Sequence, residues 1–350
     1  MVILEDPVSQ ANKFNKYFAT VGQCTATKAK ALAEEHDFDL PVTQFTSVDC
    51  NFDGLENPTF RFIPNKEEDI DKITRALPSN KAPGIDKISA RVLKDSLPVT
   101  LSVITTLINR SFTTNIFPTS WKMAEVIPCS KTGKSEDTDD PCNTRPISLL
   151  PIMSKICERS ALSQFTKYLD DNKIISQFQS GNRKHHSTET ALLYFTDELL
   201  KNMDSKKISA VVLLDMSKAF DSIRHDILLS KLKKVGISNN AISWFESYLS
   251  NRKQVVRIGN TTSEICHLNY GVPQGTILSP VLFTLYVNDL LTVPKHCQAM
   301  GYVDDTKLFL ALPSKQFNEI IPALNNDLRD IAKWCCSNSV YLLIQPKQRS

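Results

Sequence analysis

The sequence predicts an α+β fold in which an antiparallel sheet is backed by helices. Three observations support this prediction. An apolar run at residues 208–214 ends in Asp215 and has the composition of a strand. Short apolar stretches flank Asp304 and Asp305, as in a β-hairpin with acids at its tip. Segments with helical periodicity precede and separate these strands.

The composition is that of a folded protein in a reducing compartment. With 350 residues, 41% of them hydrophobic and 23% charged, the chain can form two or three lobes with a sizeable core. The net charge of +3 makes no general case for a polyanionic partner. Nine cysteines without a Cys-x-x-Cys pair indicate neither a disulfide framework nor a zinc site. Because no basic, apolar leader and no long apolar run is seen, the sequence predicts an intracellular, soluble protein without membrane contact.

The amino-terminal part, residues 1–64, is expected to be an appended segment with a linker. A helical pattern places Phe14, Phe18 and Val21 on one face, and periodicity is then lost over residues 37–41. The following segments are predicted to be a helix from residue 65 to Pro78, a turn-rich stretch at 79–88 and a helix at 89–109.

Two strands, at residues 121–128 and 144–150, are expected to flank a polar loop at 130–143. This arrangement would bring Lys131 and Arg145 near each other. An arginine at the mouth of a cleft suits phosphate, because its planar fork donates two hydrogen bonds. The alternative is that both residues are simply exposed cations.

Helices are predicted at 154–169 and 188–204, with a polar, basic segment at 177–186 that could follow a nucleic-acid backbone. In the second helix four residues are expected to face inward: Leu192, Phe195, Leu199 and Leu200. The run that ends in Asp215 is expected to be buried on both faces, since its apolar character is continuous. A carboxylate in that position is costly unless it is solvated, paired or bound to a cation.

The last third is expected to contain two hairpins and a turn. The first hairpin turns at Gly259, and an exposed turn then presents Gln274 and Gly275 ahead of a helix. The second hairpin would bring Asp304 and Asp305 to one edge, where their mutual repulsion calls for a cation. Mg²⁺ is typically held by one or two carboxylates plus substrate phosphates. The alternative is a solvated acidic turn.

Taken in order, these pieces resemble the palm of a reverse transcriptase. The segment 214–221 is similar to the first acidic box of that family, 302–305 to its signature box, and 272–275 to the turn between them. Within the family, the chain is most similar to non-LTR (LINE-type) retrotransposon enzymes, from about residue 13 to the end. Four segments carry this similarity: 80–86, 145–150, 186–191 and 334–336.

The resemblance implies a right-hand polymerase that acts as an RNA-directed DNA polymerase. Fingers of mixed helices and strands would occupy residues 65–204 and the palm 205–350, and the chain would stop before the thumb. The implied partners are an RNA template, a DNA primer and deoxynucleoside triphosphates, with a nuclear location. The oligomeric state is left open.

The resemblance also implies the site residues. Asp215, Asp304 and Asp305 would hold two Mg²⁺ ions, for which Mn²⁺ could substitute, assisted by the main-chain carbonyl of Met216 and supported by Tyr302. One ion would activate the primer 3′-hydroxyl, and both would clamp the transferring phosphate.

Nucleotide contacts follow from the same resemblance. Lys131 and Arg145 would contact the triphosphate, and Phe220 would exclude a 2′-hydroxyl group. Gln274 and Gly275 would line the pocket for the incoming nucleotide and the template.

The chain departs from the family pattern at Asn182, where relatives carry an aromatic residue, and at Gln345, where they carry asparagine. Lys347 lies one position before the expected general acid. Three function classes stay open at this stage. They are an RNA-directed DNA polymerase, another palm polymerase such as a group II intron-type maturase or an RNA-directed RNA polymerase, and a catalytically silent remnant that at most binds nucleic acid.

Overall fold

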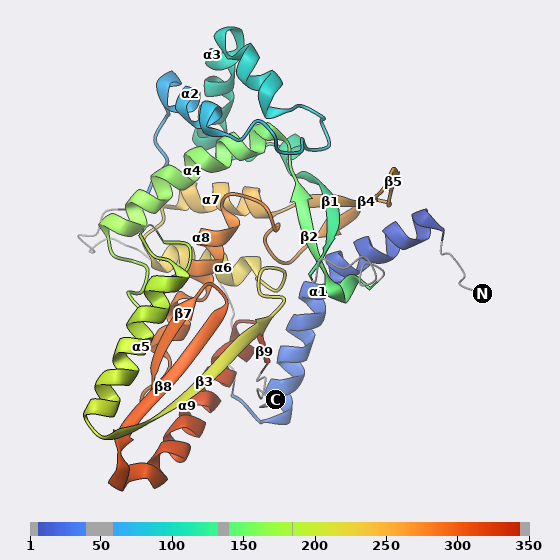
Figure 1. Cartoon of the computed structure of the whole chain (residues 1–350). Helices are drawn as coiled ribbons and strands as arrows, with labels where there is room; N and C mark the ends of the chain where they lie inside the picture. The colour runs from blue at the N-terminus through green and yellow to red at the C-terminus, as the bar shows by residue number, and fades with distance from the viewer. Residues whose placement is uncertain (1–5, 40–58, 132–139, 184, 344–350) are drawn as a thin grey trace.

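A computed structural model describes residues 6–39, 59–131, 140–183 and 185–343, and these have the predicted α+β architecture (Figure 1). The helices are α1 (Pro7–Glu35), α2 (Glu67–Ala76), α3 (Ala90–Thr114), α4 (Ile152–Asp171), α5 (Thr188–Asp204), α6 (His225–Lys234), α7 (Asn239–Leu249), α8 (Ser279–Tyr286) and α9 (Phe317–Ser337). The strands are β1 (Met123–Ser130), β2 (Thr144–Leu149), β3 (Lys207–Ser217), β4 (Arg252–Ile258), β5 (Thr261–Thr262), β6 (Cys266–Leu268), β7 (Gln298–Tyr302), β8 (Asp305–Pro313) and β9 (Tyr341–Leu343). Among the helices described, none is both long and apolar enough to cross a membrane.

Local sequence signals set the ends of the helices in the first half. α2 ends at Ala76, ahead of Pro78, as expected. The side chain of Ser89 accepts a hydrogen bond from the amide of Val92 and caps α3. This helix runs five residues past its expected end, to a cap at Asn115, which has the left-handed φ of 58° that terminates many helices.

The upper sheet, ordered β2-β1-β4-β5 with β6 paired to β4, joins segments that lie far apart in the chain (Figure 1). β1 pairs antiparallel with β2 and parallel with β4. The β4–β5 hairpin turns at Gly259, as predicted. Hydrogen bonding therefore crosses the boundary proposed between residues 204 and 205, and the division into 1–64, 65–204 and 205–350 stays a proposal.

Helix α1 packs against the upper sheet through apolar contacts and a hydrogen bond. Its apolar face lies in a buried cluster formed by Phe14, Phe18, Ala124, Val126, Leu150 and Val256. The side chain of Asn15 is buried as well and is paired with Gln254, whose Nε2 donates to Asn15 Oδ1 at 3.0 Å. The predicted helix is confirmed, and most of the expected linker, residues 40–58, lies outside the described part of the chain.

An aromatic cluster holds the middle of the molecule together. Its rings belong to Phe60, Phe62, Phe112, Phe117, Phe165, Trp244, Phe245 and Tyr248. Trp244 is fully buried, stacks on Tyr248 with the ring centroids 5.8 Å apart, and donates from Nε1 to Ser111 Oγ at 3.0 Å. Since these residues come from the segment before α2, from α3 and the connection after it, and from α4 and α7, the cluster fixes those elements to one another.

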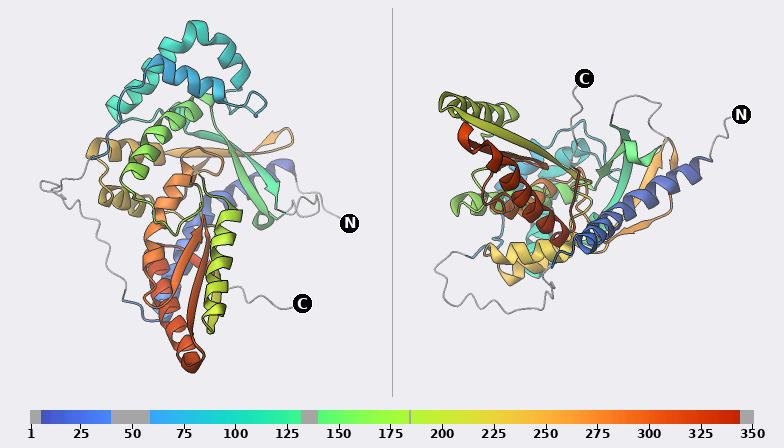
Figure 2. Two further views of the ribbon diagram at one scale, coloured as in Figure 1. Left: turned by 60° about the vertical axis from the view of Figure 1, so that its left-hand side comes forward. Right: turned by 90° about the horizontal axis from the view of Figure 1, so that it is seen from below.

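The lower sheet has the order β7-β8-β3-β9. β3 and β8 pair antiparallel from Lys207 opposite Pro313 to Leu214 opposite Thr306. Figure 2, seen from below, shows α9 on one side of β3 and α5 on the other.

The expectation that β3 is buried on both faces is wrong. Leu214 and Met216 are buried at 2% and 3% exposure, whereas Val211 and Leu213 on the opposite face are 41% and 45% exposed. Side chains alternate along a strand, so one face packs on the core and the other stays open. Asp215 belongs to the open face by this alternation.

The face of β3 stays open because helix α5 covers only part of it. It has the predicted bounds but contains no buried residue, and Leu192 and Leu200, which were expected to face inward, are 57% and 52% exposed. Only part of the helix packs on the sheet, where the ring of Phe195 meets the ring of Phe309 at 5.8 Å and the Lys307 ammonium at 5.0 Å. A helix that touches the sheet along one edge cannot bury a wide apolar stripe.

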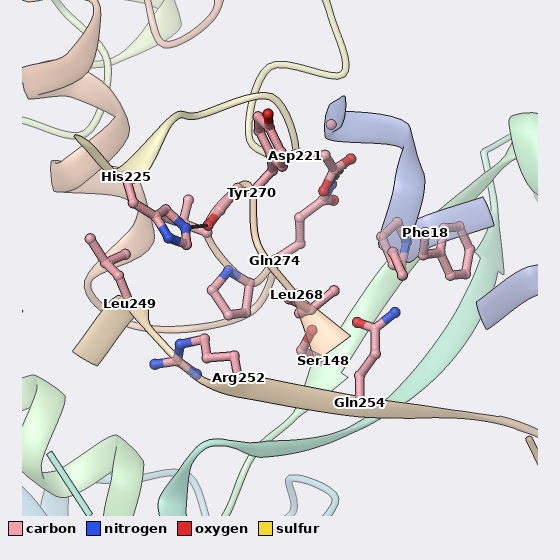
Figure 3. Close-up of a pocket in the computed structure, with 16 residues that line it drawn as sticks. Phe18, Ser148, Asp221, His225, Leu249, Arg252, Gln254, Leu268, Tyr270 and Gln274 are labelled. Carbon is pink, nitrogen blue, oxygen red and sulfur yellow. Dashed lines mark hydrogen bonds between the residues drawn. The ribbon is translucent and has the colours of Figure 1, made fainter. Parts of the chain in front are cut away.

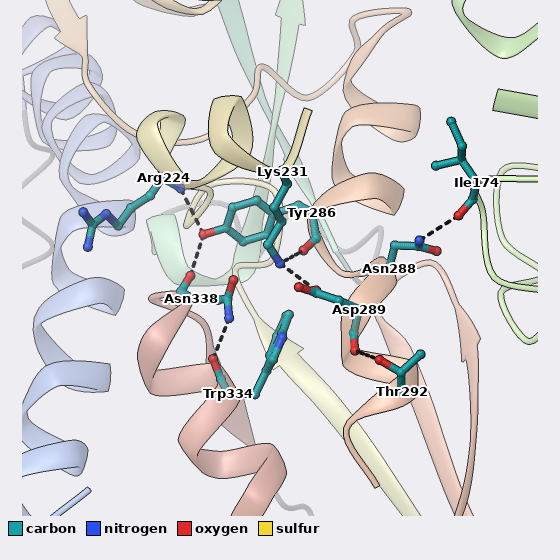
Figure 4. A network of polar contacts seen from close by, with 9 residues as sticks. All are labelled: Ile174, Arg224, Lys231, Tyr286, Asn288, Asp289, Thr292, Trp334 and Asn338. Carbon is teal, nitrogen blue, oxygen red and sulfur yellow. Dashed lines mark hydrogen bonds and ion pairs between the residues drawn. The ribbon is translucent and has the colours of Figure 1, made fainter. Parts of the chain in front are cut away.

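Behind the lower sheet, a buried polar network joins α6, α8 and α9 (Figure 4). Lys231 Nζ donates to the main-chain oxygen of Tyr286 at 2.6 Å and to Asp289 at 2.7 Å, and it lies 4.7 Å from the Trp334 ring centroid. The Tyr286 hydroxyl donates to the main-chain oxygen of Asn338 at 2.5 Å. Burial lowers the pKa of Lys231, and the Asp289 carboxylate partly opposes this shift. The network ties the helices that support the sheet.

Candidate active site

The β7–β8 hairpin places the two adjacent acids at one end of the lower sheet. Tyr302 pairs with Asp305, so Val303 and Asp304 form a two-residue turn. The predicted hairpin with acids at its tip is confirmed. Tyr302 stands on the last pair before the turn, which is consistent with a supporting role for its backbone.

The pairing of β3 with β8 brings the third acid to the same end. The last pair of the ladder is Leu214 opposite Thr306. One step further in an antiparallel register, Asp215 faces Asp305. Cross-strand neighbours point to the same side of a sheet, so these two carboxylates share the open face.

The pKa of Asp304 is influenced by burial and by the charges of Asp305 and Asp215. Burial of its carboxyl raises the pKa above the ordinary value, and the negative charges of Asp305 and Asp215 raise it further. The positive charge of Arg145, on β2 of the upper sheet, acts in the opposite direction. The charge of Arg145 therefore reaches Asp304 from the other sheet.

These three carboxylates fit a hard divalent cation by their chemistry, because Mg²⁺ and Mn²⁺ prefer oxygen ligands. Within the described ranges, no three or more His, Cys, Asp or Glu side chains are already gathered as a metal site. A bound cation would therefore have to draw the carboxylates together. Asp305 is exposed and Asp215 and Asp304 are half-buried, so their side chains have room to turn.

Lys131 and Arg145 follow the expected strand-loop-strand arrangement, but their charges act at different places. Arg145 is exposed and acts on Asp304. Lys131 donates from Nζ to the main-chain oxygen of Cys142 at 2.8 Å, and its charge acts on Asp221, where it partly opposes the burial that raises the pKa of that carboxyl. The two cations thus lie along one side of the site rather than at one point.

Phe220 follows β3 and packs on helix α8. Its ring stacks on that of Phe283 in α8, with the centroids 4.7 Å apart and an angle of 24°. Its main-chain oxygen accepts the amide of Val272 at 2.9 Å. Phe220 is half-buried, so part of its ring remains accessible.

The Pro-Gln-Gly turn packs on strand β2. The main-chain oxygen of Gln274 accepts the amide of Ser148 at 2.9 Å. Gly275 is exposed and has a φ of 104°, which side chains other than hydrogen rarely adopt. The side chain of Gln274, which was expected to point outward, donates from Nε2 to both carboxylate oxygens of Asp221 at 3.0 Å.

Asp221 lies in a pocket between the turn, α1 and β4 (Figure 3). Its carboxyl faces the amide of Gln274 in that view. Burial raises the pKa of Asp221 to about 6, against the influence of the Gln274 hydrogen bonds and the charges of Lys218 and Lys131. Sequence reasoning missed Asp221 as the partner of Gln274, since the two residues are 53 positions apart.

Asp221 is expected to make stability depend on pH. Its folded-state pKa lies above the ordinary 3.8, so its contribution is fully present below about pH 4 and is lost as the pH rises through about 6. The free energy of unfolding, measured with urea at several pH values, should therefore fall by about 2 kcal/mol more in the parent than in Asp221→Asn between pH 4 and pH 8. Parallel pH curves for the two proteins would contradict the assignment.

Strand β9 was not expected from the sequence. It pairs antiparallel with the end of β3, where Leu342 is opposite Met216. Met216 is therefore held in the sheet beside Asp215.

Lys347 and Gln345 lie outside the described residues. A second residue that sequence reasoning missed, Gln179, contacts the hairpin turn.

An antiparallel sheet whose central strand and neighbouring hairpin bring acids to one end, within reach of the charge of an arginine from a second sheet, has the architecture of a polymerase palm. Residues 131–342, more than half of the chain, match the family described as reverse transcriptase (RNA-dependent DNA polymerase). The chain belongs to this family, whose members generally use divalent metal ions. The resemblance found in the sequence is thereby confirmed.

Similar proteins come from non-LTR retrotransposons of Drosophila melanogaster. The chain is 34% identical over 294 residues to a probable RNA-directed DNA polymerase from transposon BS, covering 81% of this chain and 32% of that protein. It is 32% identical over 241 residues to the RNA-directed DNA polymerase from mobile element jockey, covering 68% of this chain and 26% of the relative. The chain thus spans about a third or less of the length of these relatives.

Proposed function

We propose that this chain carries the fingers and palm of an RNA-directed DNA polymerase, which extends a DNA primer on an RNA template from deoxynucleoside triphosphates. The observation that carries the proposal is the placement of Asp215, Asp304 and Asp305 at one end of the lower sheet, with Asp304 within reach of the Arg145 charge. Family membership supports it, and the named activity of the relatives favours the reverse-transcriptase reading over the other palm polymerases.

In this proposal, the three carboxylates and the main-chain carbonyl of Met216 hold two Mg²⁺ ions. Bound ions supply Lewis-acid chemistry that stabilises the charge on the transferring phosphate. The carboxylates would balance the positive charge of the ions and so hold them at this end of the lower sheet, where the primer 3′-hydroxyl would be oriented toward the phosphate. Burial raises the pKa of Asp304, and its repulsion by Asp305 and Asp215 raises the pKa further; a bound cation would relieve that repulsion.

The remaining residues bind and select the nucleotide. Arg145 lies where its planar fork can donate to a triphosphate above the carboxylates, and Lys131 adds charge along the same edge. Phe220 would form the floor under the sugar. Gly275 offers bare backbone to the nucleotide and template, and Gln274 holds the turn through Asp221.

Primer extension tests the proposal. The chain is incubated with a 5′-labelled DNA primer annealed to an RNA template, with deoxynucleotides and Mg²⁺. Template-directed extension that requires the divalent ion is expected. Failure to extend with either Mg²⁺ or Mn²⁺, by a chain that still binds the primer-template, would overturn the proposal. A nuclear location, which family resemblance suggests, is tested by imaging a tagged chain.

Replacing Phe220 by alanine is expected to weaken discrimination against ribonucleotides about tenfold or more, because the ring that would exclude the 2′-hydroxyl is lost. The measurement is the ratio of kcat/KM for a deoxynucleotide to that for the matching ribonucleotide. Phe317→Ala, which truncates an exposed aromatic at the start of α9, is the control and should leave the ratio unchanged. An unchanged ratio in Phe220→Ala would make this residue a packing aromatic only.

A further inference from the structure

We propose that Gln179 is a positioning residue that holds the backbone of the catalytic turn at Val303, and so orients Asp304. The role in catalysis rests on the function proposed above, whereas the contact itself can be tested without any activity. Gln179 lies in the loop between α4 and α5, 124 residues before the turn. It touches neither the substrate nor the metal in this proposal.

The turn needs support because its first residue is strained. Val303 has a φ of 59°, in the left-handed region. Two-residue hairpin turns with positive φ at the first central position favour glycine there. A β-branched residue in this region is an outlier, and such backbone persists only where the surroundings over-determine it. Val303 therefore stores strain directly beside Asp304.

The side-chain amide of Gln179 holds the strained backbone of Val303 in place through two hydrogen bonds. Its Oε1 accepts the amide of Val303 at 3.1 Å, and its Nε2 lies 3.4 Å from the Val303 main-chain oxygen, to which it donates. The same Oε1 accepts the amide of Gly181 at 2.9 Å. Gln179 is only 1% exposed. An amide is suited to this task because it offers an acceptor and a donor together.

Backbone contacts on both sides of Gln179 place its side-chain amide next to Val303. Gln179 forms a parallel bridge with Gly301 of β7, through Ser180 N donating to Gly301 O and Gly301 N donating to Phe178 O, both at 2.9 Å. A Cβ on Gly181 would lie 2.3 Å from the Val303 nitrogen, and one on Gly301 would lie 2.9 Å from Gln179 Nε2. Both glycines thus permit an approach that a side chain would block.

The first test is hydrogen–deuterium exchange of the peptide that contains Val303 and Asp304. Gln179→Met keeps the length and burial of the side chain but removes both polar contacts with Val303, together with the hydrogen bond from the Gly181 amide. Exchange at the turn is expected to become about tenfold faster, the effect of losing one net hydrogen bond. Gln177→Met is the matched control, since Gln177 is exposed two residues away, and it should exchange like the parent.

The second test concerns the two hydrogen bonds between the Gln179 side chain and the Val303 backbone, called here the clamp. It asks whether the clamp acts by opposing the backbone strain at Val303. Glycine tolerates the φ of Val303, so Val303→Gly should reduce the need for the clamp. Where the parent extends primers, Gln179→Met is expected to lower kcat about tenfold with KM for the deoxynucleotide changed less than twofold. In Gln179→Met/Val303→Gly, most of that loss should be recovered. A merely structural role for Gln179 would not be rescued at residue 303.

The outcomes separate the two proposals. A parent chain that does not extend primers would overturn the proposed function, while the exchange test still decides the clamp. Parental exchange rates in Gln179→Met, or an equal loss of kcat with and without Val303→Gly, would overturn the clamp. Should Gln179→Met fail to fold, Gln179→Glu, which keeps the acceptor toward Val303, is expected to retain protection of the turn. Loss of protection in that folded variant would also contradict the proposal.

Discussion

Replacing Asp304 by asparagine is expected to lower the rate of Mg²⁺-dependent primer extension by about 10³-fold, because one of the charges that would hold the metal ions is lost. Asp215→Asn and Asp305→Asn should have effects of similar size, since all three acids share one end of the lower sheet. The measurement is single-turnover extension of a labelled primer at saturating deoxynucleotide.

Two controls make this result interpretable. Asp71→Asn removes a half-buried carboxylate on α2, which is paired with Arg75 in the next turn of the helix, and should extend at the parental rate. Binding of the primer-template by each active-site variant should stay close to that of the parent, as measured by fluorescence anisotropy. Near-parental extension by any of the three variants would show that its carboxylate is not a metal ligand.

Replacing Trp244 by alanine is expected to lower the free energy of unfolding by about 4 kcal/mol, the upper range for truncating a large core aromatic. Its ring is fully buried against Phe117, Phe245 and Tyr248, and its indole nitrogen donates to Ser111. A cavity in that cluster would loosen the contact between α3 and α7. Urea unfolding followed by tryptophan-independent far-UV circular dichroism measures the change in midpoint.

Trp244→Phe should lose about 1.5 kcal/mol or less, because most of the ring volume remains. Phe317→Ala, which truncates an aromatic that is 54% exposed, should stay within about 0.5 kcal/mol of the parent. A midpoint for Trp244→Ala that matches that of Phe317→Ala would show that the aromatic cluster does not carry the core. The activity of Trp244→Ala should recover at low temperature if folding alone is affected.

Features that depend on neighbouring residues were predictable from the sequence. The hairpin at Asp304 and Asp305 was one, because apolar stretches on both sides of adjacent acids favour a turn at that point. The end of α2 and the start of α3 were another, since Pro78 and Ser89 act within a few residues. The order of the acids in the chain was enough to indicate the family.

Features that depend on which elements meet in the fold were not predictable from the sequence. β3 was expected to be buried on both faces, but α5 covers only part of one, and hydropathy cannot reveal how much of a sheet a distant helix covers. The pairing of β1 with β4 likewise joins residues more than 120 positions apart. α1, expected to be an appended segment, packs on that sheet through Phe14 and Phe18.

The sequence by itself determined the type of site, because the chemistry of Asp215, Asp304 and Asp305 is present in the side chains. Only the tertiary structure decided what surrounds it. Gln274 turns to Asp221, and Gln179 reaches the strained backbone of Val303. Hydrogen bonds between residues far apart in the chain leave no periodic or compositional pattern, so their partners become known only when the fold brings them within about 3 Å.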